Sequence, residues 1–496
     1  MKYISTRNNT IEIGACEAIV NGISSDGGLY VPSSFPILTL DEIKKLSKQK
    51  YPERAAYIMA KFLDEFTYEE LLSYAEKAYS RFEEDDACPL IQIDNGMYIL
   101  ELWHGPTHAF KDMALTIMPY LMTAAREKMK VKEKSLILVA TSGDTGKAAL
   151  EGFKNVEGTN VMVFYPEQGV SRIQKLQMST QEGDNVYVGA IRGNFDDAQN
   201  AVKAIFADND VKEKLLKKGY SLSSANSINW GRLVPQIAYY VSAYCDLYDG
   251  EEIKIGDKIN FVVPSGNFGN ILAGYYAMKM GLPINKLICA SNKNNVLTDF
   301  FISGKYDIKR DFYKTMSPSM DILISSNLER LLFEIGDRNS NFVVNLMNEL
   351  KSIRSYSIDK LLLRKKADCF VTGYSSEEET ADAIANFFDI YDYLLDPHTA
   401  VAMNVYNNYM TDKEDATPSV IISTANPYKF SADVYNAIED KIIDDPFKAI
   451  KKLHFLSAQE IPEDLLKLEK AEQRFTDVYN INEIKEAVLG NIDKWN

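Results

Sequence analysis

The residues most suited to chemistry lie in the segment ELWHGPTHAFKDMAL, which contains a single lysine, Lys111. Gly105 and Pro106 interrupt regular structure before this lysine. Asp112 then begins an apolar-periodic stretch with an acidic first turn, which predicts a helix over about 113–122. A lysine at such a junction has little freedom and can be partly desolvated. Because burial lowers the pKa of an ammonium group, Lys111 is a candidate nucleophile for a Schiff base with a carbonyl compound.

Two further loops combine glycine with hydroxyl or amide side chains, each between an expected strand and an expected helix. TSGDTG occupies 141–146 and SGNFGN occupies 265–270. Glycine lets the backbone approach a ligand closely, and the free N–H groups of a helix N-terminus favour an anion. The spacing Gly266-x-x-Gly269 does not match a dinucleotide-binding fingerprint. From the residues alone, a phosphate cradle and an ordinary tight turn remain equally open for 265–270.

Three other places offer polar side chains to a ligand. Asn229 and Arg232 lie in a cluster that opens an expected helix, and the planar guanidinium of Arg232 can bind phosphate through two hydrogen bonds. Arg172 and Lys175 are rival phosphate ligands. Thr424 follows an expected buried strand, where its hydroxyl can bond either to a ligand or to its own backbone.

Composition excludes several classes of function. The net charge of −15, from 55 basic and 70 acidic residues, argues against a nucleic-acid-binding protein. The five cysteines are scattered and form no Cys-x-x-Cys pair, which predicts reduced thiols in a cytoplasmic location and no disulfide or zinc framework. His104 and His108 are separated by Gly105 and Pro106, so they cannot share a helix face, and no metal site is expected. No apolar run resembles a secretory signal or a membrane span.

The order of apolar stretches predicts an α/β fold. Helical spacing is found near the N-terminus over 43–47, 55–66 and 68–81. Short buried strands are expected at 135–140, 161–165, 186–191, 259–263, 287–290, 369–371 and 419–423. Helices are expected at 145–153, 195–207, 232–248, 271–280, 376–388 and after 396–398. Strands that alternate with helices in two series predict two lobes of twisted, mainly parallel sheet flanked by helices, with a cleft between them.

Four regions follow from this order. We expect a mostly helical N-terminal domain over 1–95 and a first α/β lobe over 96–250, with Lys111 and the TSGDTG loop. A second α/β lobe with the SGNFGN loop is expected over 251–440, and a charged helical extension over 441–496.

The segment WHGPTHAFKD around Lys111 closely resembles the pyridoxal-phosphate lysine motif of threonine synthases. Three further segments are similar to that family and occur in the same order, namely TSGDTG, PSGNFGN and STANPYKF, the last at 423–430. The stretch SANSINWGR at 224–232 also looks like the family. The resemblance therefore extends from the N-terminus to about residue 430, and it implies a fold-type II enzyme. Asn426 is a departure, because many relatives have histidine there.

The resemblance implies a role for each motif. Lys111 is the catalytic residue and carries pyridoxal 5′-phosphate as a Schiff base. The cofactor contacts are Ser265, Gly266, Asn267, Phe268, Gly269 and Asn270 around the phosphate, and Thr424 at the pyridine nitrogen. The substrate contacts are Thr141, Ser142, Gly143, Asp144, Thr145, Asn229 and Arg232. For Asp144 we rather expect a structural role, in which it either orders the loop or caps the helix that follows, since aspartate is a preferred N-cap and would repel a substrate carboxylate.

The activity that the resemblance implies is that of threonine synthase, a carbon–oxygen lyase acting on phosphate. It converts O-phospho-L-homoserine and water to L-threonine and phosphate by γ-elimination and β-addition of water. The alternatives are a related pyridoxal-phosphate-dependent serine or threonine dehydratase or phospho-lyase, and a non-catalytic ligand-binding relative. We expect a small-molecule substrate, a monomer or homodimer, and neither nucleic acid nor membrane as partner.

Overall fold

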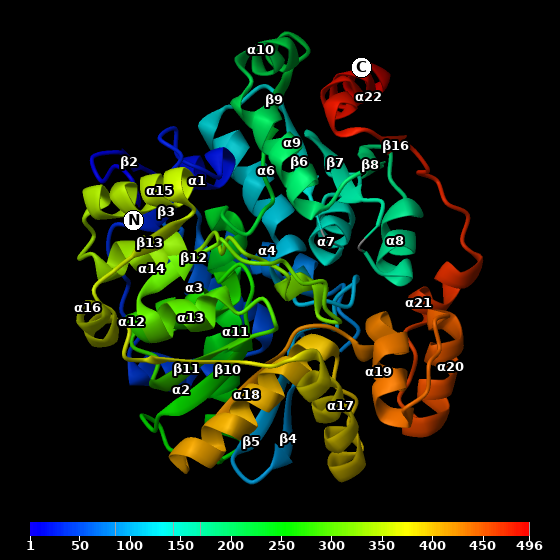
Figure 1. Cartoon of the computed structure of the whole chain (residues 1–496). Coiled ribbons are helices and arrows are strands. Elements are labelled where there is room, and N and C mark those ends of the chain that lie inside the picture. Colours follow the sequence, from blue (N-terminus) through cyan, green and yellow to red (C-terminus); the bar gives the residue numbers. More distant parts are fainter. Residues whose placement is uncertain (85, 142, 169, 496) are drawn as a thin grey trace.

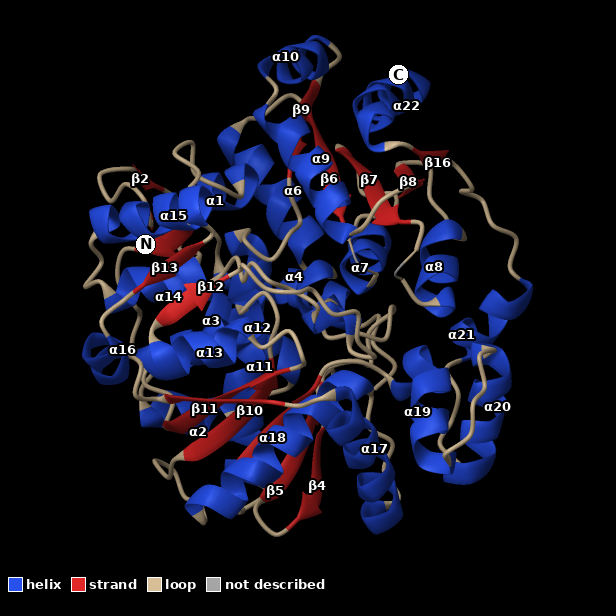
Figure 2. Cartoon of the chain, viewed as in Figure 1, coloured by secondary structure: helices blue, strands red, loops and turns tan. Residues whose placement is uncertain are grey.

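Two sheets, each covered by helices, form the body of the molecule in the computed structural model (Figures 1 and 2). The structure describes residues 1–84, 86–141, 143–168 and 170–495. A small third sheet and four helices belong to the N-terminal region, and the C-terminal residues return to the edge of one of the large sheets. The predicted α/β class with two mainly parallel sheets is confirmed.

The N-terminal region is mostly helical, as its apolar periodicity predicts. Its helices are α1 (Ala15–Asn21), α2 (Leu40–Leu46), α3 (Tyr51–Phe62) and α4 (Tyr68–Tyr79). Capping boxes at Thr39 and Thr67 begin α2 and α4, because each threonine accepts the N–H of the glutamate three residues later. Three short strands, β1 (Tyr3–Ser5), β2 (Glu12–Ile13) and β3 (Tyr30–Pro32), form an antiparallel sheet.

The first large sheet has five parallel strands in the order β16-β8-β7-β6-β9. Their bounds are β6 (Lys134–Ala140), β7 (Thr159–Pro166), β8 (Val186–Ile191), β9 (Tyr220–Ser223) and β16 (Val478–Tyr479). The three strands expected here are confirmed, whereas β9 and β16 were not anticipated. Its helices are α7 (Asp144–Gly152), α8 (Arg172–Ser179), α9 (Phe195–Ala207) and α10 (Asn209–Lys217).

The second large sheet has six strands in the order β14-β11-β10-β15-β5-β4, and only β4 is antiparallel to its neighbour. Their bounds are β4 (Leu90–Asp94), β5 (Met97–Glu101), β10 (Ile259–Pro264), β11 (Ile284–Ser291), β14 (Phe370–Tyr374) and β15 (Ser419–Ser423). Strand β5 leads directly into the Lys111 loop but pairs with β15. The lobe expected over 96–250 therefore contributes its first strand to the sheet of the later lobe.

The helices around the second sheet fall into three groups. The central ones are α5 (Asp112–Leu115), α6 (Met118–Met129), α11 (Trp230–Asp249) and α12 (Gly269–Met280). The segment between β11 and β14 holds α13 (Val296–Ser303), β12 (Lys305–Asp307), η1 (Pro318–Met320), α14 (Leu328–Ile335), α15 (Ser340–Ile353), β13 (Ser355–Ser357) and α16 (Lys360–Lys366). The last group is α17 (Glu377–Tyr391), α18 (Pro397–Lys413), η2 (Pro427–Phe430), α19 (Ser431–Glu439), α20 (Pro446–Ser457), α21 (Glu463–Lys467) and η3 (Leu468–Lys470). The C-terminal η4 (Ile481–Glu483) and α22 (Ile484–Trp495) pack instead against α9 of the first sheet.

The single helix expected over 113–122 is wrong, because the chain forms α5 and α6 instead. Pro119 lies in the first turn of α6. A proline cannot donate to the carbonyl four residues earlier and clashes with it, so α5 ends before the proline and α6 starts anew. Across the residues that the structure describes, no helix is long and apolar enough to cross a membrane.

Candidate active site

A cavity of about 730 Å³ lies where the carboxyl ends of β6, β10 and β15 meet. Ligands of α/β proteins bind at such sites, because the loops after parallel strands converge there and helix N-termini face inward. The cavity brings together Lys111, the TSGDTG loop, the SGNFGN loop, Arg232 and Thr424. Segments more than 300 residues apart in the chain thus line one site.

Lys111 is fixed by the loop that precedes α5. The carboxylate of Asp112 accepts the backbone N–H and the hydroxyl of Thr107 at 2.8 and 2.7 Å. The backbone N–H of Phe110 donates to the carbonyl of Thr424 at 2.8 Å, which ties the loop to the end of β15. Lys111 is only 8% exposed, and burial lowers the pKa of its ammonium group. The predicted desolvation of this lysine is confirmed.

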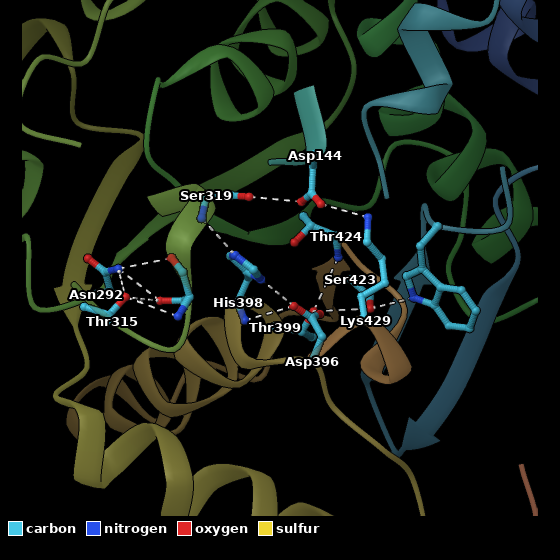
Figure 3. A network of polar contacts seen from close by, with 12 residues as sticks. Asp144, Asn292, Thr315, Ser319, Asp396, His398, Thr399, Ser423, Thr424 and Lys429 are labelled. Atoms are coloured by element: carbon cyan, nitrogen blue, oxygen red, sulfur yellow. Dashed lines mark hydrogen bonds and ion pairs between the residues drawn. The ribbon is translucent and has the colours of Figure 1, made fainter. Parts of the chain in front are cut away.

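The carboxylate of Asp144 lines the cavity and accepts hydrogen bonds from four side chains, of which Figure 3 shows Ser319 and Lys429. Its Oδ2 accepts hydrogen bonds from Lys111 Nζ at 3.2 Å and from Ser319 Oγ at 3.1 Å. Its Oδ1 accepts hydrogen bonds from Lys429 Nζ at 2.8 Å and from Gln174 Nε2 at 2.9 Å. Ser319 Oγ also lies 3.3 Å from Lys111 Nζ. Four elements therefore meet at one carboxylate.

Of the two structural roles expected for Asp144, the helix cap is wrong. Asp144 is the first residue of α7, and the N-cap position is occupied by Gly143 without a side-chain cap. Burial disfavours the charged carboxylate, but the ammonium groups of Lys429 and Lys111 outweigh it and hold the pKa of Asp144 well below its ordinary value. Asp144 is therefore an ionised group with cationic and neutral donors as partners, of which Lys111 and Ser319 line the cavity.

The SGNFGN loop forms a cradle at the N-terminus of α12. A side chain at Gly266 would place its Cβ 2.9 Å from the carbonyl oxygen of Ser319, so only glycine fits the space. Phe268 has a φ of +63° and directs its ring into the core. Asn270 accepts the hydroxyls of Tyr239 and Tyr240 on Oδ1, at 2.6 and 2.8 Å. Its Nδ2 is buried and has no partner in the described part of the chain.

Arg232 is a buried cation without a carboxylate partner among the described residues. Its guanidinium donates to the carbonyl of Ala225 at 2.9 Å and to Thr145 Oγ1 at 3.4 Å. Burial lowers the pKa of this 5% exposed side chain to about 10. A cation so placed at the wall of a cavity is suited to binding an anionic group of a ligand.

Two members of the predicted substrate set lie away from the cavity. Asn229 caps α11 through Gly231 N–H and donates to the carbonyls of Ile19 and Ser224, so its expected contact with substrate is corrected to a structural role. Gly143, with a φ of +141°, shapes the loop but does not line the cavity. Ser142 lies outside the described residues.

The other basic candidates are also directed elsewhere. Arg172 is exposed and pairs with Asp445 at 3.5 Å, and Lys175 does not line the cavity. Thr141 does line the cavity, yet its hydroxyl accepts the N–H groups of Gly143 and Gly146, at 3.0 and 2.9 Å, and so orders the loop.

Three site residues were not anticipated from the sequence. Ser319 and Lys429 contact Asp144, and His398 accepts the backbone N–H of Ser319 on Nε2 at 3.2 Å while its Nδ1 lies 2.7 Å from Asp396 (Figure 3). Lys429 lies within the STANPYKF motif, between two apolar aromatic residues, and a lysine in such a stretch is a usable signal of burial. Ser319 carries no comparable signal, because its segment shows little periodicity.

Three family models match the chain in succession. Residues 2–79 match the threonine synthase N-terminus, 88–424 match the pyridoxal-phosphate-dependent enzymes, and 399–488 match the threonine synthase C-terminal region. The chain belongs to the threonine synthase family of pyridoxal-phosphate-dependent enzymes. Its N-terminal region, both sheets and most of its C-terminal extension are thus parts of one family architecture.

Individual members of the threonine synthase family agree with this assignment. The chain is 37% identical to threonine synthase of Pseudomonas aeruginosa over 481 residues, covering 97% of this chain and 96% of that protein. It is 41% identical to human threonine synthase-like 1 over 443 residues, covering 86% of this chain but 58% of that longer protein.

Solved structures of the threonine synthase family share the fold. A threonine synthase from Brucella melitensis, described with bound pyridoxal phosphate, is 36% identical and aligns over 99% of both chains with a TM-score of 0.87. The yeast threonine synthase is 33% identical and aligns over 99% of both chains with a TM-score of 0.88. The two-lobed α/β architecture is therefore that of the family.

Proposed function

We propose that this protein is a threonine synthase that converts O-phospho-L-homoserine and water to L-threonine and phosphate. One observation carries the proposal: the cavity sets the buried amine of Lys111 beside a buried guanidinium, Arg232, that has no carboxylate partner in the described chain. The first group suits a carbonyl cofactor and the second suits an anionic substrate. The near full-length similarity to curated threonine synthases supports the same activity.

The residues present fit pyridoxal phosphate. The unpartnered Nδ2 of Asn270 can donate to the cofactor phosphate, and the bare backbone at Gly266 and Gly269 offers N–H groups at the start of α12. Ser265, Asn267 and Phe268 complete that cradle through the same loop, and all six residues line the cavity. The hydroxyl of Thr424 would serve the pyridine nitrogen as a neutral partner, and Lys111 would hold the aldehyde carbon.

The cofactor, when bound, withdraws electrons from an amino acid joined to it, which makes the protons on its α- and β-carbons acidic. Lys111 is the residue that we assign to moving those protons. Burial lowers the pKa of its amine, so Lys111 can accept and return a proton more readily than an exposed lysine. Ser319 Oγ, between Lys111 and Asp144, holds the amine in place.

The substrate brings two anionic groups into the cavity. We assign its phosphate or its carboxylate to Arg232 and Thr145, which already contact each other through the guanidinium and the hydroxyl. The α-carboxylate would lie beside the TSGDTG loop, whose position there we assign to Thr141, Ser142 and Gly143. Asp144 would orient the lysines and not bind the carboxylate, because two carboxylates repel each other.

The decisive experiment identifies the products formed from O-phospho-L-homoserine. Threonine and phosphate in equal amounts are expected from the purified protein, and neither from Lys111→Ala. A keto acid with released phosphate would instead indicate a dehydratase or phospho-lyase, and no turnover by protein with a full complement of cofactor would indicate a binding protein. Borohydride reduction followed by peptide mapping should place the cofactor on Lys111, and a label elsewhere would overturn the site.

Two further proposals concern the cellular location and the assembly of the protein. We propose a cytoplasmic protein, which is supported by five free, buried cysteines. A monomer or homodimer remains our proposal for the assembly.

A further inference from the structure

Lys429 is a buried lysine for which the proposed reaction has no use. Its side chain is 0% exposed and enters the site from η2, just after β15. Its Nζ donates to the carbonyl of Thr107, in the Lys111 loop, and to Asp144 Oδ1, both at 2.8 Å. A buried ammonium is costly unless it is paired, so its retention in this place needs a reason.

The geometry around Asp144 supplies that reason. Two ammonium groups share one carboxylate, with Lys429 on Oδ1 and Lys111 on Oδ2. Lys111 must work as a neutral amine, both to capture a carbonyl cofactor and to accept protons. If Lys111 were the only counter-ion of Asp144, each loss of its proton would leave a buried carboxylate unpaired, at a high cost in free energy.

We propose that Lys429 is the permanent counter-ion of Asp144, a positioning residue that keeps this carboxylate ionised and in place while Lys111 gains and loses its charge. The role rests on the proposed function, since it presumes a working lysine at position 111. It also gives Asp144 a constant orientation, because Gln174 and Ser319 donate to the same carboxylate. The Lys111 loop gains a second anchor through the carbonyl of Thr107.

The charge of Lys429 acts on Lys111 in a defined direction. Burial lowers the pKa of Lys111, Asp144 raises it, and the like charges of Lys429 and Arg232 lower it. The other polar group against the amine is Ser319 Oγ, and the ring of Phe110 lies 4.7 Å from Nζ. Removal of the charge at position 429 should therefore raise the pKa of Lys111. The amine would then hold its proton more tightly and be a poorer nucleophile.

The test measures the amine itself in cofactor-free protein. Acetylation by acetic anhydride, followed across pH and quantified on the Lys111 peptide by mass spectrometry, reports the midpoint at which Lys111 loses its proton. Lys429→Met should raise this midpoint by about one to three pH units, the range that a nearby charge produces. Lys429→Gln, which keeps N–H donors for Thr107 and Asp144 without the charge, should raise it similarly.

The matched control is Lys147→Met. Lys147 is a partly buried lysine on α7, the helix that begins with Asp144, but it pairs with Glu151 and Gln181 and does not line the cavity. Its loss should leave the midpoint unchanged. The assignment would be overturned if the midpoint moved no further in both Lys429 variants than in Lys147→Met. It would also be overturned by a wild-type midpoint in Lys429→Gln alone, because Lys429 would then act only through its hydrogen bonds and not through its charge. No substrate is used, so these outcomes are independent of whether threonine is formed.

Discussion

Replacement of Asn270 by aspartate is the sharpest test of the cofactor cradle. The Oδ1 atom of Asn270 holds the hydroxyls of Tyr239 and Tyr240, whereas Nδ2 is buried and has no partner in the described chain. Aspartate has the same shape and keeps the acceptor for both tyrosines. It removes the donor and, when ionised, adds a negative charge, and therefore changes what the cradle offers to an anion while leaving its support in place.

The expected loss follows from the type of bond. A hydrogen bond to a charged group contributes about 1.5–3 kcal/mol, and its removal should raise the dissociation constant of pyridoxal phosphate by about 10- to 150-fold. An ionised aspartate also repels the phosphate. The weakening should therefore increase with pH, as the carboxyl group at position 270 loses its proton.

The assay is a titration of cofactor-free protein with pyridoxal phosphate, followed by absorbance at about 410–430 nm, where the lysine-bound cofactor is expected to absorb. Asn348→Asp is the matched control, because it adds the same charge on an exposed position of α15. A dissociation constant for Asn270→Asp within about threefold of that of Asn348→Asp would refute the assignment of Nδ2 to the phosphate.

Three further predictions concern other parts of the site. Arg232→Met should raise KM for the phosphorylated substrate by about 10- to 150-fold, while cofactor binding in the same titration stays near wild type; an unchanged KM would exclude Arg232 from substrate binding. Gly266→Ala should destabilise the protein by about 1–3 kcal/mol in urea unfolding, since the new Cβ would meet the carbonyl of Ser319. Gly490→Ala, which has open space inside α22, should instead stabilise the protein by about 0.5–1 kcal/mol, because alanine favours a helix interior over glycine. Asp144→Asn should lower the stability of cofactor-free protein by a constant amount at pH 5–7, and the difference from wild type should shrink as pH falls below 3.8. Because the pKa of Asp144 is lowered in the folded state, its charge stabilises the fold fully above the ordinary pKa of 3.8. That stabilisation is lost as the pH falls from 3.8 toward the lowered pKa of the folded state. A stability difference that is the same at pH 3 and pH 7 would contradict this.

The buried strands were the most predictable part of the fold. The stretches 135–140, 161–165 and 259–263 are mainly apolar, and each belongs to a parallel strand buried on both faces. β4 and β16 were missed for different reasons. β4 is half-exposed and lies at a sheet edge, and β16 has two residues whose pairing with β8 depends on a return of the chain from nearly 300 positions away.

The site was predictable where chemistry and local structure coincide. Local glycine, proline and helix-start signals were enough to predict Lys111 and the loop at 265–270 as site residues. The structure places both at one cavity. Ser319 reaches Lys111 only through the fold, so no local pattern around it could reveal the contact. Asp144 shows the opposite error. Its position suggested a cap, but long-range cations decide what its carboxylate does.

The charges of the cavity explain why these features belong together. Lys111, Lys429 and Arg232 are buried cations, and Asp144 is the carboxylate that two of them share. Burial of an excess of positive charge destabilises the charged forms of these groups. The pKa values of Lys111 and Arg232 are lowered for this reason. A phosphorylated cofactor and a substrate with phosphate and carboxylate groups would each offset it. Anion binding would therefore offset the destabilising effect of these cations. In this arrangement Lys429 stays paired with Asp144, and Arg232 is available to bind the ligand.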